Sequence, residues 1–153
     1  MLEKVLFATD FSECSGKALE FLKKLKDVGE VVVLHVVDEK EIFTIVTNVV
    51  WIGETTKEYE DELRRKLKSK AKEEMEKLRE ELEKEGFMVE VKIVEGRPAE
   101  KIVEIAEIEK TELIIMGSHG KSNLRDVLIG SVSEGVLRRT KVPVTIVKRD
   151  SVI

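Results

Sequence analysis

The chain has 153 residues, a length that fits one domain with a single sizeable core. Apolar residues make up 42% of it and charged residues 38%, with a net charge of −4 and both signs interspersed. This composition excludes a disordered chain and gives no electrostatic footprint for binding nucleic acid. No apolar run approaches the roughly 18 residues of a transmembrane helix, and the N-terminus lacks the features of a secretory signal. We therefore expect a cytoplasmic protein with one domain over residues 1–153 and no membrane partner.

Two details of composition add to this picture. Glutamate and lysine dominate the charged residues, glutamine is absent and asparagine occurs twice, a combination typical of proteins from hot environments. The single cysteine, Cys14, excludes an intramolecular disulfide and argues against a thiolate metal cluster. A reactive thiolate in a first helical turn is one interpretation of Cys14, and a small, partly buried side chain is the preferred one.

The first third of the chain predicts two strands around a helix. Residues 3–8 (EKVLFA) form a short strand, and Ser12 is a candidate cap of the helix that follows. Gly29 fits a C-terminal stop for this helix, whose apolar positions are Ala18, Leu19, Leu22 and Leu25. The apolar run VVVLHVV (31–37) indicates a strand buried on both faces, as in a parallel sheet covered by helices.

Residues 42–52 (IFTIVTNVVWI) do not fit a plain connection between two elements. They contain eight apolar side chains in eleven positions, including the only Trp. One interpretation is a satellite apolar cluster or short helix packed on the domain. The other is a flap over a ligand site or a contact surface for a partner. The sequence alone does not separate them.

Residues 56–85 predict the longest helix, and Gly86 ends it. Its apolar stripe has positions three or four apart and drifts from strict heptads, which disfavours a coiled coil. Further elements follow in alternation: a strand at 88–96, a helix from Pro98 to about 110, a strand at 112–116, a helix at 131–140 and a strand at 143–149. The alternation predicts a single-domain α/β fold, an open and mostly parallel five-stranded sheet with helices on both faces.

Glycines cluster after the fourth predicted strand, where open parallel sheets bind their ligands. Gly117 and Gly120 would allow a tight turn and a close approach of backbone N–H groups to an anion. Gly130 and Ser131 open the next helix, whose N-terminal dipole favours phosphate. The alternative is structural: Ser131 and Glu134 match a capping box, and the glycines can be turn residues. Neither a Walker A loop nor a G-x-G-x-x-G motif is present.

The spacing Gly117-x2-Gly120-x9-Gly130-Ser131 resembles the G-2x-G-9x-G-(S/T) signature of the ATP-binding branch of the universal stress protein family. The segments ATDFSECSGKAL, VVVLHVVDE, ELIIMGSHGKSNL and KVPVTIVKR are similar to that family in the expected order. The resemblance covers essentially the whole chain. It implies a Rossmann-like fold of the adenine nucleotide alpha hydrolase type.

The resemblance also implies roles for individual residues. Asp10 would accept hydrogen bonds from ribose hydroxyls, Ala8 and Thr9 would shape the adenosine pocket, and Val36 would meet adenine through its backbone. The ribose and phosphates would be held by Met116, Gly117, Gly120, Gly130, Ser131 and Val132. Lys121 and Arg125 lie outside the signature; one interpretation has them approach the outer phosphates, and solvated charges are the preferred one.

The ligand implied is ATP, with AMP or ADP as alternatives, and Mg or Mn could enter on its phosphates. No residue is assigned a catalytic or metal-ligating role, since His35 is interpreted as a satisfied buried imidazole and His119 as a loop residue. The resemblance further implies a homodimer in which the last strand, Val144–Val147, pairs with its symmetry mate. We expect a nucleotide-binding regulator that acts on an unknown protein partner. The alternatives are a slow or partner-dependent ATPase and a structural stress protein that binds no nucleotide.

Overall fold

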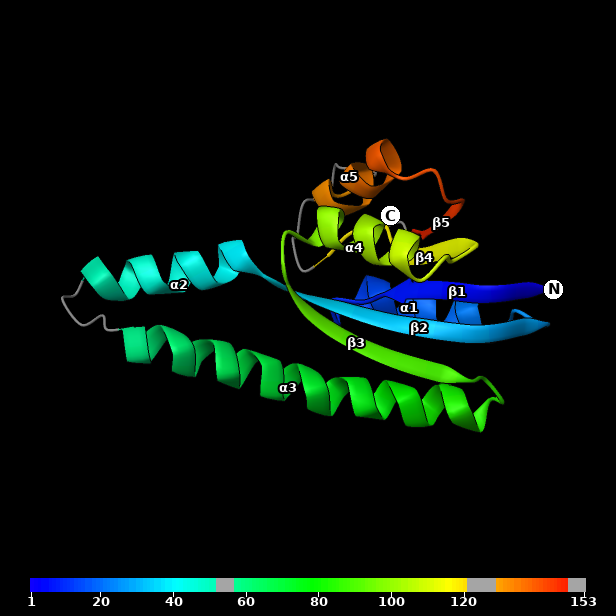
Figure 1. The fold of residues 1–153 in the computed structure, drawn as a ribbon, viewed down its shortest axis with the longest axis horizontal. Helices are drawn as coiled ribbons and strands as arrows, with labels where there is room; N and C mark the ends of the chain where they lie inside the picture. Colours follow the sequence, from blue (N-terminus) through cyan, green and yellow to red (C-terminus); the bar gives the residue numbers. More distant parts are fainter. Residues whose placement is uncertain (52–56, 121–128, 149–153) are drawn as a thin grey trace, which may run out of the picture.

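The computed structural model describes residues 1–51, 57–120 and 129–148. Strands and helices alternate along this part of the chain (Figure 1). In order they are β1 (Leu2–Ala8), α1 (Glu13–Lys23), β2 (Val28–Asp38), α2 (Glu39–Trp51), α3 (Lys57–Lys84), β3 (Val89–Gly96), α4 (Pro98–Ile108), β4 (Leu113–Gly117), α5 (Ser131–Arg139) and β5 (Val144–Val147).

The five strands of the described residues form one parallel sheet in the order β3-β2-β1-β4-β5. The chain first builds outward from β1 to β3 and then crosses back to place β4 on the other side of β1. The order therefore reverses between β1 and β4, which is the switch point at which such sheets bind ligands. The predicted open parallel sheet is confirmed.

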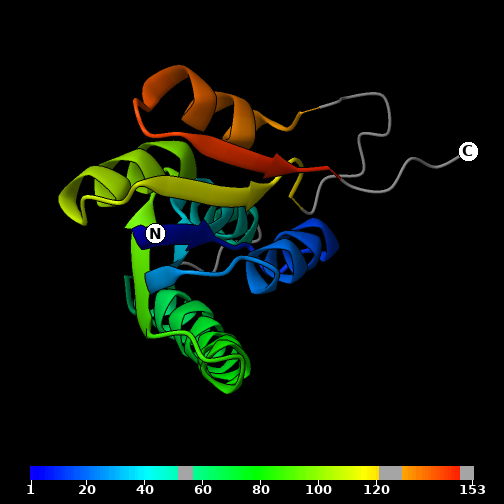
Figure 2. The same cartoon turned by 90° about the vertical axis from the view of Figure 1, so that its right-hand side faces the viewer.

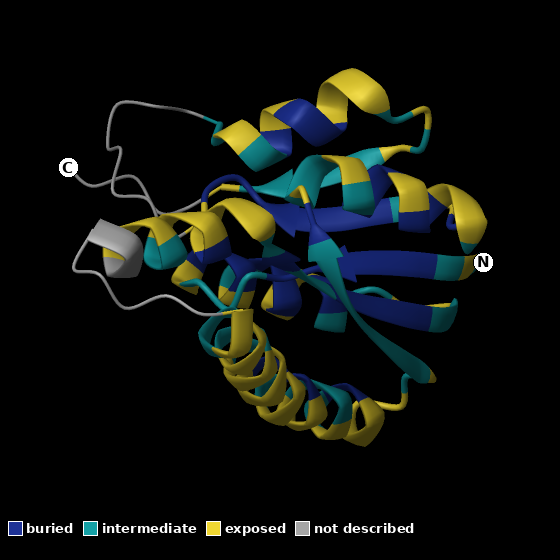
Figure 3. Cartoon of the chain, turned by 60° about the vertical axis from the view of Figure 1, so that its left-hand side comes forward, coloured by how far each residue is buried: buried dark blue, intermediate teal, exposed yellow. Residues whose placement is uncertain are grey.

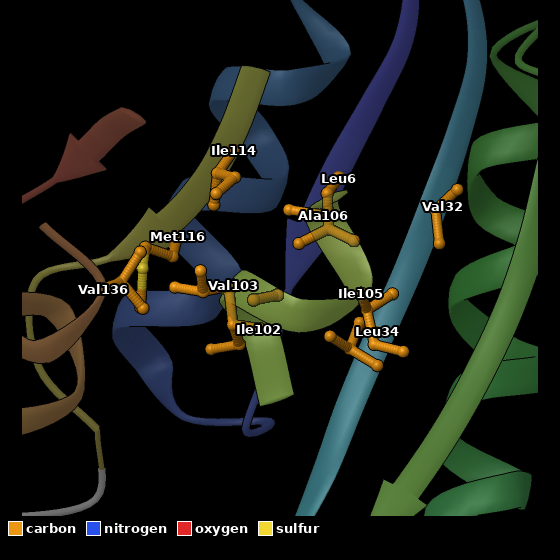
Figure 4. Close-up of a cluster of buried hydrophobic side chains, with 11 residues drawn as sticks. Leu6, Val32, Leu34, Ile102, Val103, Ile105, Ala106, Ile114, Met116 and Val136 are labelled. Carbon is orange, nitrogen blue, oxygen red and sulfur yellow. The ribbon is translucent and has the colours of Figure 1, made fainter. Parts of the chain in front are cut away.

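Helices cover both faces of the sheet, as the apolar strands predict (Figure 2). On one face α1 and α3 pack over the odd-numbered side chains of β1 and β2, such as Val5, Phe7 and Val33. On the other face α4 and α5 cover the even-numbered ones, including Leu6, Val32 and Leu34 (Figure 4). Burial is concentrated in the central strands, and the outer side of α3 is exposed (Figure 3).

The ends of the helices follow local signals in two cases and not in a third. Ser12 caps α1 by accepting a hydrogen bond from the Ser15 N–H at 3.2 Å, and Pro98 begins α4. The prediction that Gly29 stops α1 is wrong, because the helix ends at Lys23 and Gly29 lies in β2. A Cβ at position 29 would lie 2.5 Å from the carbonyl oxygen of Glu3, so a close contact with β1 requires glycine there.

The apolar segment 42–52 is helical up to Trp51 as part of α2, which starts directly at the end of β2. Helices α2 and α3 lie side by side and extend beyond the sheet (Figure 1). Ile42 is buried, whereas Phe43 is 71% exposed. The described residues of this segment therefore form a helix, and helix formation is compatible with both interpretations. The rest of the segment lies outside the part of the chain that the structure describes.

A cluster of ion pairs joins the sheet to the end of α4. The carboxylate of Glu109 accepts hydrogen bonds from the ammonium groups of Lys92 and Lys4, the latter at 3.0 Å, and these bonds lower the pKa of Glu109. A carboxyl group whose pKa is lower in the folded chain stabilises the fold above its ordinary pKa and loses that contribution as the pH falls through the folded value.

We expect Glu109→Gln to lower the free energy of unfolding by about 1 kcal/mol at pH 7, because two lysines lose a partly buried partner. The difference from the unchanged chain should shrink as the pH falls below the ordinary glutamate value of 4.5. Urea denaturation of both proteins across this pH range measures it. A difference that does not change with pH would contradict the assignment.

Candidate functional site

A cavity of about 760 Å³ lies at the carboxyl ends of β1, β2 and β4, next to the switch point. Its volume is within the range of roughly 300–1,000 Å³ that is usual for small-molecule sites. The ten residues predicted from the sequence all line it: Ala8, Thr9, Asp10, Val36, Met116, Gly117, Gly120, Gly130, Ser131 and Val132. The fold thus brings together residues that are more than one hundred positions apart in the chain.

Asp10 is held by the first turn of α1. Its Oδ1 accepts hydrogen bonds from the Ser12 N–H at 3.0 Å and from the Ser15 hydroxyl at 2.8 Å. Its Oδ2 lies on the side of Gly120, where a Cβ would be only 2.5 Å away. One carboxylate oxygen is therefore tied to the helix, and the other is presented at the cavity wall opposite the glycine loop.

The glycines of this wall fill positions with little space for a side chain, and none of them has a left-handed backbone. A Cβ on Gly117 would lie 2.9 Å from the carbonyl carbon and the Sγ of Cys14, so Gly117 allows α1 to approach β4. A Cβ on Gly130 would lie 3.1 Å from the carbonyl oxygen of Ser118. Glycine at these positions lets three pieces of backbone meet at the edge of the cavity.

Helix α5 starts at the cavity with Gly130 as its N-cap. Ser131 is exposed and occupies the first helical position, and the Glu134 carboxylate pairs with Arg138 at 2.6 Å. The capping-box interpretation of Ser131 and Glu134 is therefore wrong. The first amides of a helix have no helical acceptor. Those of Ser131 and Val132 belong to residues that line the cavity.

Ser118 joins the glycine loop to its surroundings, a role that no sequence pattern indicates. Its N–H donates to the Val147 carbonyl at 2.9 Å, and its own carbonyl accepts from Gly130 N–H and from the Ser133 hydroxyl. Its hydroxyl bonds to Nδ1 of His119 at 2.9 Å and lies 3.5 Å from Sγ of Cys14. Cys14 is buried, which favours the packing interpretation of its thiol. The loop is thereby attached to α1, α5 and β5.

His35 is half-buried, and its Nδ1 lies 2.8 Å from the carbonyl oxygen of Thr9. Since a carbonyl only accepts, Nδ1 carries the proton, which agrees with the interpretation of a satisfied imidazole. Among the described residues no three His, Cys, Asp or Glu side chains cluster as a metal site.

The wall that faces the sheet comes from α2 and α3, and no residue of these helices was among the predicted site residues. Five residues of these helices line the cavity: Glu41, Leu67, Lys70, Ala71 and Glu74. Their spacing at 67, 70, 71 and 74 is that of one helix face, so the face was recognisable, but its position over the site was not. Lys121 and Arg125 lie outside the described residues.

The fold and the cavity define the class: a doubly wound parallel α/β domain with a ligand-sized site at its switch point. The match to the universal stress protein family extends over residues 1–148, and the chain belongs to that family. In the described part of the chain no helix is long and apolar enough to cross a membrane.

Relatives cover almost the whole chain. It is 46% identical to the universal stress protein MJ0577 of Methanocaldococcus jannaschii, over 97% of this chain and 96% of that protein. It is 32% identical to the universal stress protein YxiE of Bacillus subtilis, over 97% and 100% of the two chains. The solved structure of MJ0577 superposes with a TM-score of 0.85 and covers 98% of each chain, and that of PH0823 does so with a TM-score of 0.78 at 36% identity, over 97% and 98%.

Proposed function

We propose that this universal stress protein binds ATP, with AMP or ADP as weaker or alternative ligands. The observation that carries the proposal is the close approach of Gly120 to Asp10, beside the N-terminus of α5. The cavity therefore contains a carboxylate that would accept hydrogen bonds from ribose hydroxyls and backbone amides that would donate to phosphate. The adenosine end of the ligand would be contacted by Ala8, Thr9 and Val36.

Two proteins of the same fold were solved with an adenine nucleotide. A universal stress protein solved in complex with cAMP is 21% identical with a TM-score of 0.61. A family member from Arabidopsis thaliana solved with AMP bound is 19% identical with a TM-score of 0.65. At these identities the likeness concerns the fold alone, and the proposal for this chain therefore rests on its own cavity.

The proposed role is that of a nucleotide-dependent regulator in the cytoplasm, acting through a protein partner, with little or no hydrolysis of its own. Phosphoryl transfer requires a cation at the γ-phosphate and an oriented nucleophile. The ten proposed contact residues supply amides, hydroxyls and one carboxylate. Of the described residues that line the cavity, Lys70 of α3 alone is a lysine or arginine, and it is not among those ten. A Mg or Mn ion would bind together with the nucleotide, and phosphate oxygens and water would be its ligands.

We also propose a homodimer through β5, at one end of the strand order. Its residues Val144–Val147 are all half-buried in the single chain, and three of the four are apolar. Pairing with a second β5 would satisfy the backbone groups of this edge.

Native mass spectrometry of the protein as purified tests nucleotide binding and the dimer, and a time course after addition of ATP tests for hydrolysis. We expect a species at twice the chain mass of 17.4 kDa that carries one adenine nucleotide per chain, or takes up one on addition of ATP. Added ATP should remain intact for many minutes. Turnover near 1 s⁻¹ would contradict the regulator assignment, no uptake would refute nucleotide binding, and a monomer at tens of micromolar would refute the dimer.

A further inference from the structure

Phe11, in the turn between β1 and α1, has a backbone that bulky residues rarely adopt. Its φ is 64°, in the left-handed region. Its N–H donates to Oγ1 of Thr9 at 3.0 Å, which closes the turn. Its ring stacks on the imidazole of His35, with centroids 4.4 Å apart and planes 29° from parallel. Strained backbone of this kind persists only where the surroundings hold it, and it is often found at ligand sites.

His35 holds the same turn at a second point. Its Nδ1–H donates to the carbonyl of Thr9 at 2.8 Å, and the Thr9 N–H donates to the carbonyl of Leu34 at 2.9 Å. One side chain of β2 therefore fixes the residue before Asp10 through a hydrogen bond and the residue after it through a ring contact. Asp10 lies between the two fixed points.

The backbone of Asp10 belongs to this turn, and its carboxylate is held at the start of α1. Its Oδ1 bonds to the Ser12 N–H and the Ser15 hydroxyl, and its Oδ2 lies 2.5 Å from the Cβ position of Gly120. With so little space beside Gly120, a small rotation of the turn would move Oδ2 away from the position at which a ribose would meet it. Phe11 and His35 both line the cavity as well.

We infer that Phe11 and His35 are positioning residues, whose stacked rings aim Asp10 at the ribose hydroxyls and so set the preference for a ribonucleotide. Neither belongs to the ten residues proposed to contact ATP. The inference rests on the proposed function, since it assigns a purpose to the Asp10 carboxylate within that site.

The test compares ATP with 2′,3′-dideoxy-ATP, which lacks the hydroxyls that Asp10 would bind. Isothermal titration calorimetry would give Kd for both ligands with the unchanged protein and with Asp10→Asn, Phe11→Ala and His35→Ala. Phe21→Ala serves as the matched control, because Phe21 lies on the exposed side of α1 and does not line the cavity. Thermal unfolding by circular dichroism checks each fold, and His35→Ala removes the stack independently if Phe11→Ala does not fold.

We expect the unchanged protein and Phe21→Ala to bind ATP roughly tenfold more tightly than the dideoxy ligand. In Phe11→Ala and His35→Ala this ratio should fall to about two, as in Asp10→Asn, while the Kd for the dideoxy ligand changes less than about threefold. An equal loss for both ligands would mean that the rings only support the cavity, and an unchanged ratio would mean that they do not act on Asp10. Either result overturns the inference while leaving ATP binding intact, whereas an unchanged protein that binds neither ligand refutes the proposed function itself.

Discussion

Replacing Gly120 with valine is expected to abolish ATP binding, with an affinity at least roughly 100-fold lower, while the protein still folds. The new Cβ would lie 2.5 Å from Oδ2 of Asp10, so the carboxylate must leave the position proposed for the ribose. Losing the hydrogen bonds from Asp10 accounts for about tenfold of this loss, and the valine side chain, which enters the cavity wall where the ligand would lie, accounts for the rest. Gly120 is exposed at the cavity edge, so the core does not depend on it. Calorimetric titration with ATP and a thermal unfolding curve measure the two effects.

Gly16→Val is the matched control for this substitution. Gly16 lies in α1, and a Cβ built there has no heavy atom within 4 Å outside its own helix and its chain neighbours. Valine is a better helix former than glycine, so the control should bind ATP normally and unfold at the same or a slightly higher temperature. An unchanged ATP affinity in Gly120→Val would refute the assignment of this wall to the nucleotide.

Replacing Gly117 with alanine is expected to lower the free energy of unfolding by about 2 kcal/mol, the typical cost of an added group in a packed interior. The added Cβ would lie 2.9 Å from the backbone carbonyl carbon of Cys14 and 2.9 Å from its Sγ. Backbone atoms of a helix cannot move aside as a flexible side chain does, so α1 must shift away from β4. Urea denaturation at constant m-value measures the loss.

The same substitution in a Cys14→Ala variant separates the contact with the backbone of Cys14 from the contact with its sulfur. In a Cys14→Ala background the sulfur is absent and the backbone contact remains, so Gly117→Ala should still cost more than about 1 kcal/mol. If the cost disappears together with the sulfur, the thiol and not the helix backbone requires glycine at 117. A cost below about 0.5 kcal/mol in both backgrounds would contradict the close approach altogether.

The order of elements and the location of the site could be predicted from the sequence because both follow from local patterns. Apolar runs such as 31–37 indicate buried strands by their composition alone, and Pro98 and Ser12 start helices through their own backbone chemistry. Carboxyl ends of parallel strands meet at one edge of a sheet, so Asp10 and Gly117 had to lie near each other once the sheet was assigned.

The errors and omissions concern contacts between distant parts of the chain. Gly29 was assigned to a helix end because a glycine after an apolar periodic segment usually has that role, whereas contact with Glu3 in β1 decides its position. Ser131 matched a cap by spacing, but Gly130 adopts the cap geometry itself. The links from Ser118 to Val147 and Cys14 join the loop after β4 to β5 and α1, and contacts of this kind produce no periodic pattern in the sequence.

The switch point also has a consequence for stability. The cavity takes Asp10 from the first strand-helix connection and Ser131 from the last helix, so its two sides belong to opposite halves of the sheet. A nucleotide held there would act as a removable cross-link between these halves, and any opening that separates β4 from β1 would release it. By mass action, ligand at one hundred times its Kd would add about 2.7 kcal/mol to the free energy of unfolding. The free nucleotide concentration in the cell would then determine how strongly the two halves of the sheet are held together.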